Sequence, residues 1–391
     1  MRFYRYSGIL AVLCCVPVLA RAGEAEGAGT PQTFSDRVLP VLQRGAARFE
    51  AGPFEASLHG RLNVWTGWVG SDALLSEGDP MQEYGFRMRR VRFGVDGSLF
   101  QTVTFGIEMD LFDSEKQGGP LYDAWVDWTP THWFGFQVGF QKFPFVKTEM
   151  NSSAGTAHLD RALGVKAMAP ANTLGLAIHS DLWKDHLRLT LGVFNGLQRN
   201  ASFWEGYEGV GVSLGSRFQR LAYVGRLDIE PLARLGSGEP DLQGGPVRLG
   251  FGGGGFYSDG KTDEIFGASG YLHLKAYGFH FLGEAVWDRA RPQKQPTTVT
   301  TTPAEVDRVT AQGSLGYFIR PITTGLAVRT EYIDNHMDQK DEGDQVVVAA
   351  TLTHYVVQHY LKAMFEYQTR IELHGRKLKN DSAILGIQLA F

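Results

Sequence analysis

Two short motifs in the sequence have the spacing of sites that perform chemistry. Residues 211–215 read Gly-Val-Ser-Leu-Gly, the spacing of a hydrolase nucleophile elbow, which needs a strand, a sharp turn and then a helix. Residues 250–255 read Gly-Phe-Gly-Gly-Gly-Gly and fit the dinucleotide-binding fingerprint, which needs a βαβ unit. No helical pattern follows either motif. We therefore interpret both as glycine-rich strand or loop sequence and predict no cofactor.

The histidines point to no particular chemistry. The chain has 11 of them, scattered without the spacing of metal ligands, and we predict no metal site. A serine hydrolase that uses His179, His273 or His280 as its base stays an open alternative. Nothing in the sequence pairs one of these rings with Ser213, so we expect no catalytic residue and no enzyme.

The first 22 residues have the three parts of a secretory signal peptide. Arg2 and Arg5 precede the apolar run 8–19, and residues 20–22, Ala-Arg-Ala, form a small-x-small cleavage site. We predict cleavage after Ala22. An uncleaved anchor helix is the alternative, although about 20 apolar residues are needed to span a bilayer.

Removal of this segment decides several properties of the mature chain. Cys14 and Cys15 are the only cysteines, so no thiol, disulfide or cysteine metal site would remain. Three arginines and no acid leave with the segment, which takes the formal net charge from −4 to −7 and argues against nucleic-acid binding. The mean hydropathy of −0.17 is too polar for a helical membrane protein.

From residue 54 onward the dominant hydrophobic period is two. Residues 103–110, Val-Thr-Phe-Gly-Ile-Glu-Met-Asp, alternate an apolar with a polar or small side chain, and the same alternation returns in residues 58–68, 90–96, 187–193 and 361–367. Such segments, separated by turn residues, are typical of strands with lipid on one side and water on the other. We predict a transmembrane antiparallel β-barrel over residues 54–391, preceded by a periplasmic leader at 23–53. A soluble β-sandwich is the alternative.

The pattern offers one candidate strand too many, because a closed bacterial barrel needs an even number. Short inner turns must alternate with longer outer loops, so residues 247–258 must run outward and residues 221–230 inward. Residues 209–218 then belong to an outer loop, which leaves about sixteen strands.

The same topology predicts the connections between strands. Outer loops are expected at 70–85, 143–172 and 289–306, and short turns at 184–185, at 320–323 and at Gln358. One connection does not fit this rule. Residues 231–246 form a long stretch, yet the topology places it at the periplasmic end.

Two further features favour the bacterial outer membrane and its lipids. The last strand alternates up to a terminal Phe391, as barrels of that membrane typically present to their assembly machinery. Aromatic residues, among them Trp65, Trp128, Trp133 and Trp183, gather near predicted strand ends, where an interfacial girdle is expected.

Residues 84–97, Tyr-Gly-Phe-Arg-Met-Arg-Arg-Val-Arg-Phe-Gly-Val-Asp-Gly, resemble the first shared block of the phosphate-selective porins O and P. Further blocks follow in the same order at 121–126, 138–145, 159–163 and 192–196, and then at Arg226, Pro231 and 283–284. The resemblance implies a homotrimeric porin. It also implies a third outer loop that folds into the barrel and narrows it, and lumenal arginines that attract anions.

By this resemblance, residues 143–172 form the infolded third loop. Its basic residues would line the constriction, with Lys142 at the root of the loop, and matching arginines would stand on the wall. The alternation pattern adds one more arginine, at position 61, to the inward face. The candidate pore-lining and anion-binding residues are therefore Arg61, Arg90, Arg92, Lys142, Lys147, Arg161, Lys166 and Arg226.

The alternation places similar numbers of basic and acidic residues in the lumen, so the charge count alone predicts no preference. Selectivity would depend on where the charges cluster, and the planar guanidinium group suits phosphate oxygens. Arg90 and Arg92 could equally pair with Glu108 or Asp110 on the next strand and brace the wall.

We therefore predict an outer-membrane porin through which small anions, phosphate among them, diffuse passively in a water-filled lumen. Two alternatives stay open: a general porin for small neutral or cationic solutes, and a structural or adhesive barrel with a plugged lumen. A conductance trace separates the last, because a plugged barrel passes no current.

Overall fold

The computed structural model describes residues 38–40, 42, 47–70, 83–112, 120–170, 172–183, 186–199, 203–208, 220–236, 238–260, 263–292 and 305–391. The predicted signal peptide, the turn 184–185 and the stretch 209–218 lie outside these residues. Among the described residues, no helix is both long and apolar enough to cross a membrane.

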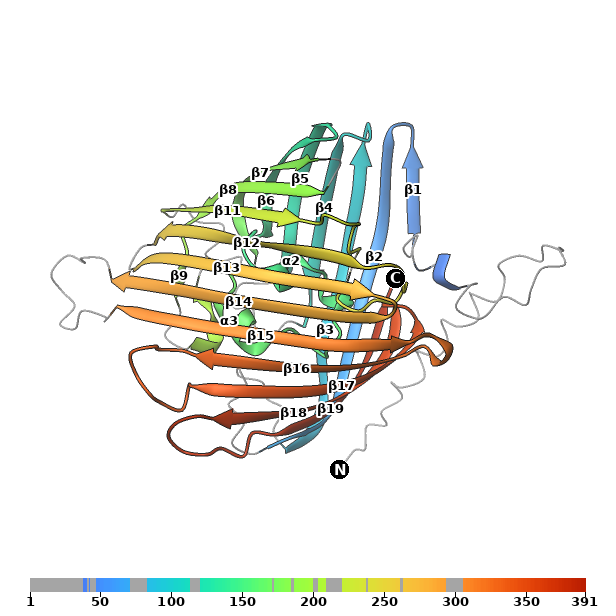
Figure 1. The fold of residues 1–391 in the computed structure, drawn as a ribbon. Helices are drawn as coiled ribbons and strands as arrows, with labels where there is room; N and C mark the ends of the chain where they lie inside the picture. The colour runs from blue at the N-terminus through green and yellow to red at the C-terminus, as the bar shows by residue number, and fades with distance from the viewer. Residues whose placement is uncertain are drawn as a thin grey trace, which may run out of the picture.

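Sixteen antiparallel strands form a closed barrel (Figure 1). Each strand pairs with its neighbours in chain order, and the ring closes where β19 pairs with β2 through Gln388 opposite Asn63. The strands are β2 (Phe54–Val69), β3 (Glu83–Leu99), β4 (Val103–Asp110), β5 (Leu121–Thr131), β6 (Phe134–Lys142), β7 (Asn172–Leu182), β8 (Leu187–Asn195), β11 (Leu221–Ile229), β12 (Arg248–Asp259), β13 (Asp263–Ala276), β14 (Phe279–Pro292), β15 (Val306–Ile319), β16 (Thr324–Asp334), β17 (Gln345–Val357), β18 (Leu361–Glu372) and β19 (Ser382–Ala390).

A further strand, β1 (Ala47–Ala51), lies outside this ring. It pairs with the first residues of β2, where Ala51 lies opposite Phe54, and so extends the wall next to the end of β19. These residues lie within the predicted periplasmic leader, and the structure shows that they form a short hairpin with β2. Residues 38–40 and 42, also within the predicted leader, are helical.

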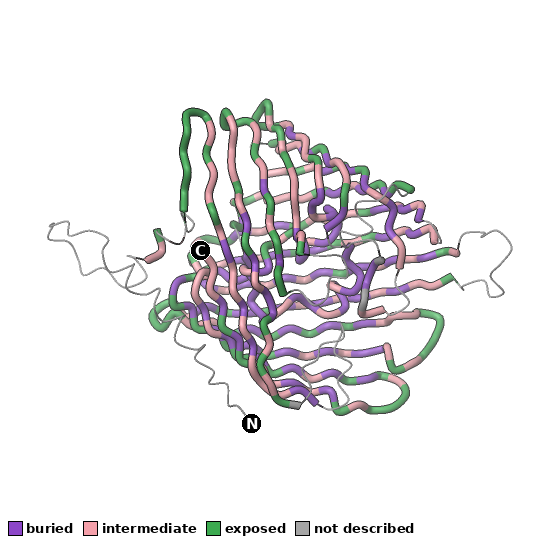
Figure 2. Tube along the Cα trace, turned by 180° about the vertical axis from the view of Figure 1, so that it is seen from behind, coloured by how far each residue is buried: buried purple, intermediate pink, exposed green. Residues whose placement is uncertain are grey.

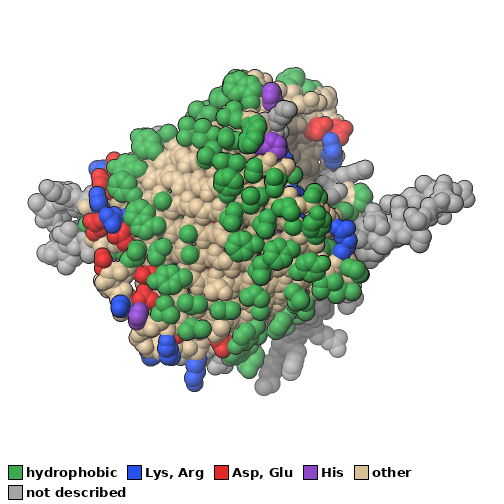
Figure 3. All heavy atoms as spheres, in the orientation of Figure 1, with side chains coloured by type: hydrophobic (Ala, Val, Ile, Leu, Met, Phe, Trp, Pro, Cys, Tyr) green, Lys and Arg blue, Asp and Glu red, His purple; other side chains and the backbone are tan. Residues whose placement is uncertain are grey.

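Burial alternates along the strands as the period of two predicts (Figure 2). In β16, Leu326 and Val328 are 53% and 50% exposed, whereas Arg329 and Glu331 are 4% and 1% exposed. The exposed apolar side chains cover the outside of the wall, with charged side chains at its margins (Figure 3). This arrangement suits a wall that faces lipid outside and polar groups inside.

Three of the predicted girdle aromatics lie on the outside of the wall. Trp128, Trp133 and Trp183 are 50%, 49% and 62% exposed. The prediction for Trp65 is wrong, because its ring is 8% exposed and packs with Leu159 inside the barrel. The alternation pattern already puts Trp65 on the polar face, and that assignment is confirmed.

The two ends of the barrel differ in the length of their connections. One end has turns of a few residues, including the predicted turns at 320–323 and at Gln358, and left-handed backbone at Thr323 and Gln358 closes two of them. The other end carries most of the long connections. Periplasmic turns of outer-membrane barrels are short, so we call the first end periplasmic and the second outer.

Some predicted loop bounds differ from the structure. β3 begins at Glu83 and β14 runs to Pro292, so the strands are longer than their alternation suggests. The connection 260–262 is short although it lies at the outer end. The long connection between β11 and β12 lies at the periplasmic end, where the topology predicts it.

The connection between β6 and β7, here called the third segment (residues 143–171), is the third at the outer end. It contains α2 (Lys147–Met150), η2 (Ser153–Gly155) and α3 (Leu163–Met168). Phe143 and Phe145 are fully buried against inward-facing aromatic rings: the ring centroids of Phe143 and Phe194 lie 5.0 Å apart and those of Phe145 and Phe256 lie 4.8 Å apart. An apolar core of this kind fixes the segment against the inside of the wall.

Candidate functional site

A β-bulge on β3 turns two successive arginines into the lumen. The register between β2 and β3 shifts after Asn63, which lies opposite Arg90, while Val64 lies opposite Met88. Arg89 is the extra residue, and both arginines are almost fully buried, at 2% and 3% exposure. A bulge re-aims side chains in this way.

Arg89 is a lumenal residue of this site that the alternation pattern misses. A strict period of two directs it toward lipid, and an arginine at the bilayer midplane costs about 2–4 kcal/mol on that face. Its charge in a lipid-facing position is therefore the signal in the sequence that could have revealed the bulge.

Asp160, from the third segment, binds both bulge arginines. Arg89 donates from Nε and Nη2 at 3.0 and 2.6 Å, and Arg90 donates from Nη2 at 2.8 Å. Burial alone would raise the pKa of Asp160, but the two guanidinium groups outweigh burial and hold that pKa well below its usual range. This ion triad ties the third segment to β3.

Arg92 braces the wall instead. Its Nε lies 2.5 Å from Asp110 and its Nη1 lies 3.0 Å from Glu108, both on β4, and its guanidinium stacks over the Tyr122 ring at 3.4 Å. The sequence left open whether Arg92 pairs with Glu108 or Asp110 and braces the wall, and these contacts show that it does. Arg90 pairs with the third segment and not with β4.

Arg61 has a different environment from its neighbours. It lies directly opposite Arg92 in the pairing of β2 with β3, which sets two like charges side by side. Its side chain is partly exposed, and its buried Nε has no hydrogen-bond partner among the described residues. No carboxylate of the described chain forms an ion pair with it, so it carries a free positive charge in the lumen.

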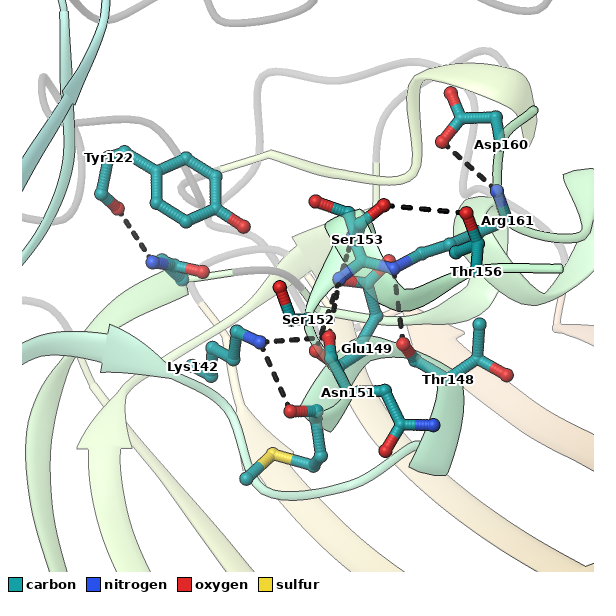
Figure 4. A network of polar contacts seen from close by, with 12 residues as sticks. Tyr122, Lys142, Thr148, Glu149, Asn151, Ser152, Ser153, Thr156, Asp160 and Arg161 are labelled. Carbon is teal, nitrogen blue, oxygen red and sulfur yellow. Dashed lines mark hydrogen bonds and ion pairs between the residues drawn. The ribbon is translucent and has the colours of Figure 1, made fainter. Parts of the chain in front are cut away.

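Lys142 and Arg161 shape the third segment from within (Figure 4). Lys142 donates to the backbone oxygens of Met150 and Asn151, both at 3.1 Å. Arg161 donates to the backbone oxygens of Thr148 and Asn151 and forms an ion pair with Glu149 at 2.8 Å. Since Arg161 is only 6% exposed, its contacts hold the loop together. Lys142 has a donor left over for other partners.

Lys147 and Arg226 border a cavity of about 470 Å³ on the periplasmic side of the third segment. Arg226 donates to Asp228 at 2.5 and 2.7 Å and to the backbone oxygen of Phe145 at 2.8 Å. The Lys147 ammonium lies 5.2 Å from the centroid of the Tyr271 ring and has no hydrogen-bond or ion-pair partner among the described residues. Burial lowers the pKa of Lys147.

The remaining candidate, Lys166, lies in α3 and is partly exposed. Its positive charge also lowers the pKa of Asp160, although less than the charges of Arg89 and Arg90 do.

The eight predicted residues divide into three groups by their place in the structure. Arg61, Arg90 and Arg92 stand on β2 and β3, Lys142, Arg161 and Lys166 belong to the third segment and its root, and Lys147 and Arg226 meet at the cavity.

The third segment is also tied to the opposite side of the barrel. Its backbone N–H groups donate to inward carboxylates, at 2.5 Å from Lys147 to Glu284 on β14 and at 3.1 Å from Leu159 to Glu366 on β18. His158 bonds to Thr351 on β17 at 2.7 Å. These contacts place the segment against inward-facing side chains. Whether it sets the size of passing solutes stays a prediction.

The glycine run 250–255 lies within β12, where Gly252 pairs with Tyr271 of β13. No helix follows it, so it is not a dinucleotide loop. The serine motif 211–215 lies outside the described residues.

The fold resembles those of solved outer-membrane porins and channels. The outer-membrane channel DcaP of Acinetobacter baumannii matches with a TM-score of 0.61 at 12% identity, covering 88% of this chain and 100% of that one. An anion-selective porin from Comamonas acidovorans matches with a TM-score of 0.55 at 11% identity, covering 86% and 100%. The trimer form of OmpT from Vibrio cholerae matches with a TM-score of 0.54 at 11% identity, covering 86% and 99%. The chain therefore has the fold of an outer-membrane porin barrel.

The family model for phosphate-selective porin O and P matches residues 62–226. This match confirms the resemblance seen in the sequence over that range. The sequence matches no curated protein at a significant level. The matched range contains every predicted site residue except Arg61.

Proposed function

We propose that this porin favours small anions, inorganic phosphate among them, and lets them diffuse passively through its lumen. The observation that carries the proposal is the free charge of Arg61, which lies opposite Arg92 and has no carboxylate partner among the described residues. A second free cation, Lys147, borders the cavity farther inward. Unpaired charges of one sign along a channel raise the local concentration of ions of the other sign.

Phosphate is a suitable solute on chemical grounds. An arginine fork donates two parallel hydrogen bonds to phosphate oxygens, and Arg61 has unused donors. Lys142 adds an ammonium within electrostatic reach of Arg92 and Arg161. The anion-selective porin from Comamonas acidovorans shares this barrel fold, which supports the proposal.

The reversal potential of the purified protein in a planar bilayer under a salt gradient tests anion preference directly. We expect a potential of the sign that anion flow produces, and we expect added phosphate to reduce the chloride current. In Arg61→Gln, the ratio of anion to cation permeability should fall by a factor of about three to five, because one unit charge near a passing ion is worth about 1 kcal/mol in water.

Asp338→Asn, in an exposed outer loop, serves as the control and should leave the ratio unchanged. Cation preference in the unaltered protein would make it a general porin. Absence of current would favour the structural or adhesive barrel with a plugged lumen. The many contacts of the third segment inside the barrel are the observation that supports this alternative.

We also propose that the barrel assembles as a homotrimer, as the trimer form of OmpT does. Chemical cross-linking in membranes followed by electrophoresis without boiling tests this. A band of three chain masses is the expected result, and a single-chain band after efficient cross-linking would contradict it.

A further inference from the structure

The long periplasmic connection between β11 and β12, here called the inner segment, folds into the barrel. It comprises residues 230–236 and 238–247 of the described chain. Leu235, Glu239 and Asp241 are only 2%, 5% and 1% exposed. A loop on the outside of the barrel would leave such side chains in water. This connection is therefore long, unlike the other periplasmic turns of the described chain, because it enters the barrel and returns.

Hydrogen bonds fix the inner segment to the wall. Lys275 of β13 donates from Nζ to the backbone oxygens of Leu235 and Gly238, at 3.0 and 2.7 Å. Asp241 forms an ion pair with Arg248 of β12 and accepts from the backbone of Gly278 at 2.9 Å. Buried lysine and aspartate side chains bound in this way give the segment one conformation.

Close packing adds to these hydrogen bonds. Leu235 lies against Gly250 of β12, where an added Cβ would stand only 2.5 Å from a Leu235 methyl carbon. On its other side, Gly238 approaches His359 in the turn between β17 and β18, since a Cβ on this glycine would lie 2.7 Å from the ring Nε2. The inner segment thus extends from β12 to β17 across the periplasmic half of the lumen.

The inner segment meets the third segment inside the barrel. The backbone N–H of Glu239 donates to Gly155 at 2.8 Å, and the Glu239 carboxylate accepts from the backbone N–H of Ala157 at 2.9 Å. The backbones also touch, because a Cβ on Gly155 would lie 2.6 Å from the Cα of Gly238. Glu239 therefore joins two segments that enter the lumen from opposite ends.

The third segment crosses the lumen, and the two segments overlap on the side formed by β12–β18. The described hydrogen bonds of the third segment reach β3, β6, β11 and β13–β19, and its apolar core covers β7, β8 and β11–β14 near the outer end. The inner segment covers β12, β13 and the turn after β17. Space is left where the cavity of about 470 Å³ borders β6, β7, β8 and β11, with Gln137, Lys142 and Arg188 among its lining residues.

We propose that the inner segment and the third segment, joined through Glu239, close the centre of the lumen and confine permeation to an off-axis passage beside β4–β6 that continues into the cavity bordered by β6, β7, β8 and β11. The inference rests on the proposed function, because it requires that the barrel conducts. Glu239 is a positioning residue here, which acts by holding the two segments together. Lys142 lines the cavity where this passage joins it, so it can contact solutes at that point.

Single-channel recordings of Glu239→Ala test the joint between the segments. The alanine cannot accept from Ala157, so the segments should separate and conductance should rise about twofold as a second path opens in parallel. Glu239→Gln keeps an oxygen that can accept this hydrogen bond and should restore the low conductance. A fold check by electrophoretic mobility without boiling accompanies each variant.

The passage itself is tested on β6 with two neighbouring residues that face opposite ways. Gln137→Trp narrows the cavity and should remove most of the current, whereas Val138→Trp faces lipid, at 44% exposure in the native chain, and should conduct normally. An unchanged conductance in Glu239→Ala, or a normal current in Gln137→Trp, would overturn the inference while the porin function stands. No current from the unaltered protein would overturn the proposed function instead.

Discussion

Arginines that pair with carboxylates and an arginine that does not lie close together on β3 and β2. Arg89, Arg90 and Arg92 each bind carboxylates at 3.0 Å or less, and each is at most 4% exposed. Arg61 has no carboxylate and keeps part of its side chain exposed. The difference teaches that a lumenal arginine is not evidence for solute binding by itself. The paired arginines hold the structure together, and the unpaired ones are left to act on ions.

Loss of the shared carboxylate should give the largest effect. Asp160→Ala leaves two buried guanidinium groups without their counterion, a change that typically costs about 3–5 kcal/mol. Urea unfolding in lipid vesicles, followed by tryptophan fluorescence, should show a large drop in the midpoint or a failure to refold. Asp338→Ala, on an exposed loop, is the matched control. Equal midpoints for both variants would mean that the ion triad does not stabilise the barrel.

Removal of a paired arginine from the wall should change both stability and selectivity. Arg92→Gln leaves Glu108 and Asp110 without their shared cation, so the lumen gains negative charge and the barrel loses about 1–3 kcal/mol. The reversal potential should move toward cation preference. If it moves as little as in the Asp338→Asn control, the charges of β4 do not reach the passage.

Removal of an unpaired cation should change selectivity alone. Lys147→Gln takes away an ammonium that has no ion-pair partner among the described residues, so stability should change by less than about 0.5 kcal/mol. Anion preference should fall, and the fall should shrink as ionic strength rises because salt screens the charge. A large loss of stability would place Lys147 with the structural group.

A last prediction concerns the pH dependence of stability and His359, in the periplasmic turn after β17. Burial, with Lys362 and Lys275 next, lowers the pKa of this ring well below the usual 6.5. Above pH 6.5 the ring is neutral in both states, and below it the unfolded chain binds the proton first. Stability should therefore fall by up to about 1.4 kcal/mol per pH unit below that value, and the loss should be smaller in His359→Gln.

The barrel could be predicted from the sequence because each strand has one lipid-facing and one lumen-facing side, and this alone produces the period of two. The strand parity argument assigned residues 221–230 and 247–258 to opposite directions, and β11 and β12 run as predicted. A long connection at the periplasmic end followed from that argument, although nothing in it showed that the connection folds inward.

The site was harder to predict because its contacts join distant parts of the chain. Arg89 faces the lumen only because a bulge interrupts the alternation, and a bulge leaves no periodic signal. The partner of Arg90 could not be found on a neighbouring strand, because Asp160 comes from a connection 70 residues away. Pairing of strands is a local property of the wall, whereas pairing of charges inside it is not.

The ties of the third segment also bear on how the chain assembles. The backbone oxygen of Ala154 accepts a hydrogen bond from Gln388 on β19, 234 residues farther along the chain. Asp160 binds Arg89 on β3, which precedes the third segment in the chain. The contact with Gln388 can form only when the last strand, β19, has been added to the wall, so the third segment has both contacts only at that stage. Contacts between such distant residues form slowly, because the chain must lose much of its freedom before they form. The lumen should therefore fill late in folding, and an unclosed barrel should be recognisable by a third segment that proteases can still cut.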